Sequence, residues 1–168
     1  ALNYFDGLVP RTSDATNRFV ISGTVPQGGS QRVVRMNPLN PAERVTFEGD
    51  TGITASSTAC NDDGTCLGVW AVNGFLVART VSTSGSLSDP TVIATGGPFQ
   101  YVSVASDGQG FSAIWGDGVT WWFGLANPQP LPATAYWSRL FWAGDRYVAV
   151  GQSAGSTTVN CLRGECGS

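Results

Sequence analysis

Neither histidine nor lysine occurs among the 168 residues, and their absence limits the chemistry that the side chains can perform. A Ser-His-Asp triad, a Cys-His dyad, a Ser-Lys dyad, a lysine Schiff base and a His-ligated metal centre each require one of these two residues. We therefore expect no metal and no cofactor. Catalysis would be restricted to carboxylates, as in glycosidases, where two Asp or Glu side chains flank one sugar bond.

Five of the 12 carboxylates, however, occur in four clear turn sequences. The turns are Asp62-Asp63-Gly64, Asp107-Gly108, Asp117-Gly118 and Gly144-Asp145. Asp is favoured in turns because its side chain accepts hydrogen bonds from the nearby backbone, and Gly because it tolerates positive φ. The sequence thus predicts no catalytic residue, and an extracellular hydrolase that uses a carboxylate pair remains the alternative.

Aromatic residues give the one positive indication of a binding site. Trp121-Trp122-Phe123 and Tyr136-Trp137 flank a proline-rich segment, 127–132. Either these rings pack between sheets, or one tryptophan is exposed and stacks on a sugar ring beside polar side chains. On the second interpretation the candidate ligand-binding residues are Trp121, Trp122, Trp137, Arg139 and Asp117.

The four cysteines form two close pairs, Cys60 with Cys66 and Cys161 with Cys166. Each pair brackets a turn sequence, so we predict a disulfide across each of two hairpins. One structural zinc bound by four thiolates is the alternative, but the spacings are wider than in usual zinc knuckles. Local disulfides indicate an oxidising compartment, so we expect a secreted or extracellular protein.

Charge excludes several partners. All nine basic residues are arginines, they are dispersed along the chain, and the net charge is −3. Without a basic stripe to neutralise phosphates, neither nucleic acid nor an anionic membrane surface is an expected partner. No apolar run approaches the ~20 residues needed to cross a bilayer, so we expect no membrane insertion.

Composition and length favour one all-β domain. The chain has 42% hydrophobic and 12% charged residues with 22 glycines, and it is poor in the helix formers Glu and Lys. Its length suits a single domain that buries well over half of the surface that the unfolded chain exposes.

An internal repeat organises this β structure. Residues 59–70 (ACNDDGTCLGVW) and 105–115 (ASDGQGFSAIW) both read as strand, Asp-Gly turn and apolar strand ending in Trp. A third copy spans 141–151 and a weaker fourth spans 14–23, and neither contains that Trp. Because Trp70 and Trp115 recur at one repeat position, we predict that both lie in the core.

The repeats align on four residues that should begin the second strand of each unit: Phe19, Cys66, Phe111 and Tyr147, spaced by 47, 45 and 36 residues. Further strands are expected after each one. The third strands are predicted at 32–36, 75–79, 121–125 and 157–162, and the fourth at 43–47, 91–94 and 131–133. A four-stranded meander that recurs at this period predicts a β-propeller-like array, because each small sheet needs neighbours on both faces.

The segment of small residue, Asp-Gly, aromatic, apolar residues and Trp also resembles the repeats of secreted bacterial propeller-type proteins. The resemblance covers about 100 residues outward from Cys60 and Ser106, and it is to the repeat and not to one protein. It implies one blade per repeat.

The predicted units are about 8–50, 51–97, 98–135 and 136–168, the last completed by 1–7. The fourth unit lacks an outer strand, so we expect the N-terminal strand to close the ring by joining it. A ring shared by several chains and a piece excised from a longer polypeptide are the alternatives.

The function predicted from these features is a secreted, non-enzymatic recognition or adhesion module. Its expected partners are a glycan or a surface protein, or further copies of itself in a homo-oligomer or larger assembly at the cell surface.

Overall fold

The computed structural model describes residues 4–10, 19–24, 31–37, 40–48, 53–82, 86–132, 136–153 and 155–162, with side chains described from residue 53 onward. Every regular element in these ranges is a β-strand. None of the described residues forms a helix that could span a membrane. The prediction of an all-β fold is confirmed.

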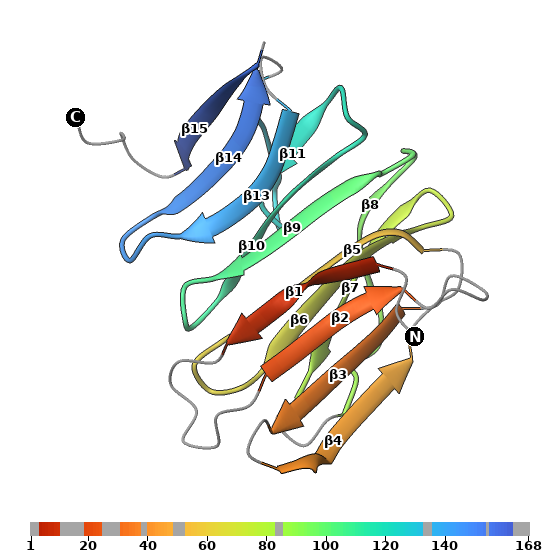
Figure 1. Cartoon of the computed structure of the whole chain (residues 1–168). Helices are drawn as coiled ribbons and strands as arrows, with labels where there is room; N and C mark the ends of the chain where they lie inside the picture. Colours follow the sequence, from red (N-terminus) through yellow and green to blue (C-terminus); the bar gives the residue numbers. More distant parts are fainter. Residues whose placement is uncertain are drawn as a thin grey trace.

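The strands form four antiparallel meanders in chain order (Figure 1). The first sheet contains β1 (Tyr4–Pro10), β2 (Phe19–Thr24), β3 (Gln31–Asn37) and β4 (Asn40–Glu48). The second contains β5 (Ile53–Cys60), β6 (Cys66–Val72), β7 (Phe75–Val81) and β8 (Thr91–Thr95). The third contains β9 (Tyr101–Ser106), β10 (Phe111–Gly116), β11 (Trp121–Phe123) and β12 (Gln129–Pro130). The fourth contains β13 (Tyr136–Trp142), β14 (Tyr147–Ser153) and β15 (Ser156–Leu162).

The repeat alignment is reproduced in the structure. Phe19, Cys66, Phe111 and Tyr147 are each the first residue of the second strand in their sheet. The hairpin before β10 shows why: Gly108 has a φ of 93°, and a Cβ there would lie 2.6 Å from a carboxylate oxygen of Asp62. Glycine is favoured because of this positive φ, so the Asp-Gly pair fixes where the hairpin turns.

The predicted closure is wrong. The N-terminal strand β1 pairs with β2 and completes the first sheet, whereas the last sheet has three strands, β13, β14 and β15. The fold is therefore an open row of four sheets and not a ring of four four-stranded blades. In Figure 1 the β13–β15 sheet stands at the end of this row.

Apolar side chains between consecutive sheets form the core. Trp70 and Trp115 are each 3% exposed, which confirms that both lie in the core. One cluster joins the second and third sheets and includes Val69 and Trp115. Another joins the third and fourth and includes Ile114 and Leu140. The third sheet is thus covered on both faces, as the repeat predicted, and the second sheet also lies beside the first through β2 and β5.

Buried serines connect the first strands of neighbouring sheets. The hydroxyl of Ser57 on β5 accepts a hydrogen bond of 3.0 Å from the backbone N–H of Val104 on β9. The hydroxyl of Ser103 on β9 likewise accepts one of 3.0 Å from the N–H of Leu140 on β13. Ser57 pairs with Val69 and Ser103 with Ile114, so the two serines occupy the same repeat position. They satisfy backbone donors that face a neighbouring sheet instead of a strand partner.

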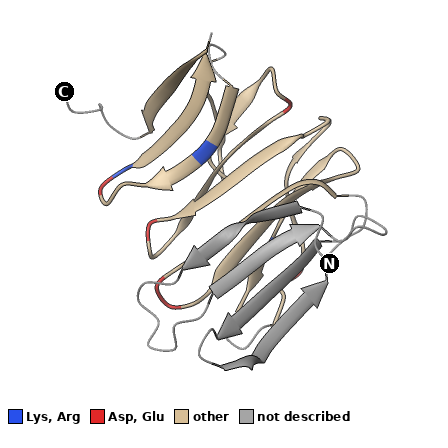
Figure 2. Cartoon of the chain, viewed as in Figure 1, with Lys and Arg blue, Asp and Glu red and all other residues tan. Residues whose placement is uncertain are grey.

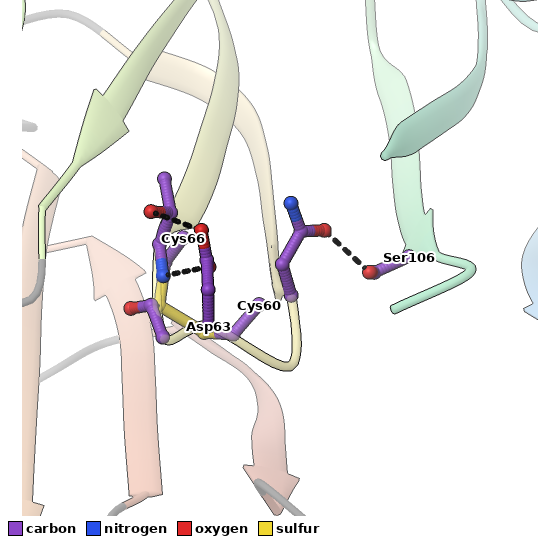
Figure 3. Close-up of a disulfide and its surroundings, with 7 residues drawn as sticks. Cys60, Asp63, Cys66 and Ser106 are labelled. Carbon is purple, nitrogen blue, oxygen red and sulfur yellow. Dashed lines mark hydrogen bonds between the residues drawn. A yellow bond between two sulfur atoms is a disulfide. The ribbon is translucent and has the colours of Figure 1, made fainter. Parts of the chain in front are cut away.

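The disulfide between Cys60 and Cys66 is present, as predicted. It joins β5 to β6 at the base of their hairpin, and Figure 3 shows Asp63 in the same turn and Ser106 in the adjacent sheet. The hydroxyl of Ser106 donates a hydrogen bond of 2.7 Å to the side chain of Asn61. The clipped hairpin is thereby attached to the third sheet. The predicted Cys161–Cys166 bond lies partly outside the described residues and stays a prediction.

Candidate functional site

A cavity of about 460 Å³ lies where the first strands of three sheets begin, β5, β9 and β13. These strands run side by side, and the cavity occupies the end at which all three start; we call it the channel-mouth cavity. Its volume falls in the range of small-molecule sites. Its polar and aromatic lining includes Thr54, Ser56, Gln100, Tyr101, Tyr136 and Arg139.

Two tyrosines form the aromatic part of the lining. The rings of Tyr101 and Tyr136 meet edge to face with their centroids 4.7 Å apart. Trp121 stacks on Tyr101 at 5.4 Å and contacts the ring of Tyr136 at 5.3 Å. Because Trp121 is buried, it supports both tyrosines from within the core. The pair therefore presents a rigid aromatic surface that can pack against a ligand.

Arg139 is the cation of this cavity. It pairs with Val150 on β14, which is the register position held by Ser57 in β5 and by Ser103 in β9. Where the second and third sheets bury a hydroxyl, the last sheet carries an exposed guanidinium. Figure 2 shows a basic residue within β13, whereas acidic residues in the drawn sheets gather at hairpin tips. Arginine can hold a carboxylate through two parallel hydrogen bonds.

β-bulges position two further lining residues. The β5–β6 register shifts at Thr54, and the β13–β14 register shifts at Ser138. Both residues line the cavity. The Thr54 hydroxyl donates a hydrogen bond of 2.9 Å to the carbonyl of Phe99, which links the second sheet to the third. Bulges are common beside binding sites because the extra residue redirects a side chain out of the regular sheet.

Of the residues that the sequence proposed for binding, Arg139 alone lines this cavity. Trp121 and Trp137 are 2% and 1% exposed, so neither can stack on a ligand from solvent. The indole N–H of Trp137 donates to the carbonyl of Pro132, and Trp122 stacks on Trp115 at 4.7 Å. The structure therefore agrees with the packing interpretation for the tryptophans, since these sheets are covered by neighbours.

Asp117 is a turn residue. Its carboxylate accepts backbone hydrogen bonds from Val119 at 2.8 Å and Thr120 at 2.7 Å. Asp107 does the same in the preceding hairpin, where Gly110 and Gln109 donate at 2.6 and 3.0 Å. These hydrogen bonds lower the pKa of each carboxyl below its usual value, because they stabilise the ionised form.

The carboxylates are thus poorly suited to general acid catalysis. A second cavity, at the opposite end of the same three strands, is lined by Asp62 and Asp107. A glycosidase acid needs a raised pKa, whereas the pKa of Asp107 is lowered. Among the described residues that line the channel-mouth cavity there is no carboxylate. Neither cavity therefore offers, among its described lining residues, a carboxyl group with the raised pKa of a glycosidase acid.

Sequence reasoning missed Tyr101 and Tyr136 as site residues. One signal was available for Tyr136, because neighbouring residues on a strand point to opposite faces. If Trp137 packs in the core, Tyr136 must face away from it, and it is in fact 39% exposed. No comparable local signal existed for Tyr101, whose place in the cavity depends on the neighbouring sheet.

Comparisons with known proteins support the fold and leave the function open. No protein-family model matches the sequence, and no curated protein matches it. Among solved structures, the chain is similar to the β-propeller domain of Cps50 (Swd1) from Myceliophteria thermophila, with a TM-score of 0.56 and 12% identity. The match covers 94% of this chain and 54% of that one, so the chain spans about half the length of its structural neighbour.

The fold is therefore of β-propeller type, built from four consecutive propeller-like sheets. At this low identity the likeness defines the architecture alone, and function must be argued from the site.

Proposed function

We propose that this protein is a secreted, non-enzymatic recognition module that binds an acidic glycan in the channel-mouth cavity. The observation that carries the proposal is the replacement of the repeat's buried serine by Arg139, which adds a guanidinium to a cavity lined by Tyr101 and Tyr136. The second and third sheets bury a serine at this position, and departures from such a local folding pattern are expected at functional sites.

The lining matches the needs of a sugar acid. Hydroxyl and amide groups of Thr54, Gln100 and Ser138 can exchange hydrogen bonds with sugar hydroxyls, and the tyrosine rings offer apolar contact. The absence of lining carboxylates among the described residues leaves the charge of Arg139 available for an anion. A hexuronate supplies all three kinds of contact in one ring.

The disulfide supports the proposed compartment. Cys60 and Cys66 are joined across a hairpin, and such bonds form and persist in oxidising compartments. A binding module for surface or environmental glycans would work in that setting.

Isothermal titration calorimetry with matched sugars tests the binding proposal. We expect an oligosaccharide of hexuronates to bind, and its methyl-esterified form, which lacks the negative charge, to bind much more weakly. Arg139→Ala should weaken binding of the acidic sugar by about ten- to a hundredfold, the value of one charge-assisted contact.

Arg146→Ala is the matched control. Arg146 lies in the β13–β14 hairpin, forms an ion pair with Asp145 and does not line the cavity, so its loss should leave affinity unchanged. Equal binding of the charged and esterified sugars, equal effects of the two substitutions, or no binding of acidic oligosaccharides would each overturn the proposal.

A further inference from the structure

A second cavity, of about 450 Å³, lies where β5, β9 and β13 end and lead into their hairpins. We call it the hairpin-end cavity. Its lining contains the last three residues of each of these strands and the turn residues Asp62, Asp107 and Gly108. Its volume lies in the range of small-ligand sites. Since its described charged residues are both acidic, it does not suit the acidic glycan proposed for the channel-mouth cavity.

Hydrogen bonds hold two of the hairpins together beside this cavity. The backbone N–H of Asp62 donates to the carbonyl of Gly108 at 2.8 Å. The side-chain amide of Asn61 donates to the carbonyl of Gln109, also at 2.8 Å. The Asp62 carboxylate lies directly against Gly108, because a Cβ built there would be 2.6 Å from one of its oxygens. The carboxylates of Asp62 and Asp107 therefore occupy two adjoining turns of one cavity.

The charge of the described lining is negative. Backbone hydrogen bonds from Gly110 and Gln109, together with the side chain of Tyr147, lower the pKa of Asp107 and keep it ionised at neutral pH. The described lining contains no arginine. In the β13–β14 hairpin, Arg146 forms an ion pair with Asp145. A cationic ligand is therefore the complementary one.

Trp142 gives the cavity an aromatic wall. It occupies the register position that Cys60 holds in β5 and Ser106 in β9, and all three residues line the cavity. The Trp142 ring contacts that of Tyr147 at 4.9 Å, and the side chain of Tyr147 hydrogen-bonds Asp107. The indole and this carboxylate thus share one neighbour. A large ring where two other sheets carry small side chains departs from the repeat, as is expected at a functional site.

An arginine side chain fits both features of this lining. Its planar guanidinium stacks on indole faces and directs five N–H donors toward carboxylates, whereas the ammonium of lysine is a single point charge. The apolar lining residues Ala59, Val104 and Leu140 suit the methylene stem. A metal ion fits less well, because the described residues contain no group of three or more His, Cys, Asp or Glu that could hold one.

We propose that the hairpin-end cavity binds an arginine side chain of a partner protein, with the guanidinium against Trp142 and within reach of the Asp62 and Asp107 carboxylates. The described lining has no cation for the α-carboxylate of a free amino acid, which favours an arginine within a polypeptide. Figure 2 shows acidic residues at the hairpin tips, where a partner can approach and where their charge attracts a basic segment. The proposal is independent of the glycan, since the two cavities lie at opposite ends of the same strands.

Isothermal titration calorimetry of the intact 168-residue chain with three matched peptides tests this proposal. The first peptide alternates glycine and arginine, the second replaces each arginine by citrulline, which has nearly the same shape without the charge, and the third replaces it by lysine. At about 0.15 M salt, where long-range attraction between exposed charges is screened, we expect the arginine peptide to bind. The citrulline peptide should bind at least about tenfold more weakly, and the lysine peptide should fall between them.

Asp62→Asn should weaken binding of the arginine peptide by about tenfold, the value of one charge-assisted hydrogen bond. Asp63→Asn is the matched control. It removes the same charge from the same exposed turn, but Asp63 does not line the cavity. Its hydrogen bond from the Thr65 N–H can be kept by the amide oxygen, so affinity should change little.

Two further variants separate the contacts and the sites. Trp142→Leu should weaken binding by about two- to thirtyfold, because a cation–π contact is lost. Arg139→Ala, in the channel-mouth cavity, should leave peptide affinity unchanged, and Asp62→Asn should leave binding of acidic sugars unchanged. The fate of this proposal is thereby read separately from that of the glycan site.

Four results would each overturn the arginine site. They are no binding of the arginine peptide, equal binding of the citrulline peptide, equal binding of the lysine peptide, and equal losses from Asp62→Asn and Asp63→Asn. The last two would indicate a general attraction between charges. Because Asp62 is exposed, its substitution should not impair folding, and thermal unfolding of each variant checks this.

Discussion

Asp107 shows how one carboxylate can hold a turn and make stability depend on pH. Because hydrogen bonds from Gly110 and Gln109 lower its pKa in the folded state, its contribution is present above the pKa of the unfolded chain, near 4. The contribution is lost as the pH falls through the lower, folded-state value. Acid should therefore destabilise the protein partly through this turn.

Asp107→Asn should flatten that acid dependence. The amide oxygen can still accept the backbone hydrogen bonds, so we expect a loss within about 1 kcal/mol at pH 7. Urea unfolding between pH 7 and pH 2 measures the change. Asp117→Asn should repeat it, since the same contacts lower the pKa of Asp117. An unaltered acid dependence in both variants would contradict the assigned role of these carboxylates.

At the scale of elements, the first strands of successive sheets are linked by side-chain hydrogen bonds and not by β-sheet pairing. Ser103 belongs to β9 but accepts the backbone N–H of Leu140 in β13. Both atoms are buried, and an unpaired buried donor is costly. The serine position in the repeat thus fixes the offset between neighbouring sheets.

Ser103→Ala should lower the free energy of unfolding by about 1–3 kcal/mol, because it leaves the Leu140 N–H without its acceptor. Denaturant unfolding measures this loss. Ser138→Ala is the control, since that hydroxyl is exposed and its removal should change stability by about 0.5 kcal/mol or less. Equal losses in the two variants would show that the inter-sheet hydrogen bond of Ser103 contributes no more to stability than the exposed hydroxyl of Ser138.

At the scale of the whole molecule, stability should vary along the row of sheets. The second and third sheets each lie between two neighbouring sheets, whereas the last is held through one cluster that includes Trp137. Local opening is easiest where few buried contacts are lost. In isolated chains, β13–β15 should therefore open before β5–β8.

Trp137→Ala should enlarge this difference. Truncating a fully buried tryptophan costs about 3–5 kcal/mol, and here the loss falls on the contact between the last two sheets. Amides of β13–β15 should exchange much faster, while those of β6 change little. Val119→Ala, at a 77% exposed position, should leave exchange unaltered. Faster exchange spread evenly over all sheets would show that the row unfolds as one unit.

Local features of the fold could be predicted from the sequence because they depend on neighbours along the chain. Asp-Gly pairs set the hairpins, apolar runs set the strands, and the repeat located the start of each second strand. The Cys60–Cys66 bond followed from the same hairpin. The strand predicted at 131–133 is instead found at Gln129–Pro130, where proline limits the pairing that would define a strand.

The repeated β-sheet unit and the limits on its chemistry were determined by the sequence alone, because strand pairing within a unit spans few residues and the absence of His and Lys does not depend on shape. Tertiary structure decided what lies between units. It placed β1 in the first sheet, buried Trp121 and Trp137, and grouped Arg139 with Tyr101 and Tyr136. Those outcomes depend on contacts between sheets whose residues lie about 40 positions apart in the chain. The alternation of residues within one strand does not show which face of its sheet a neighbouring sheet will cover.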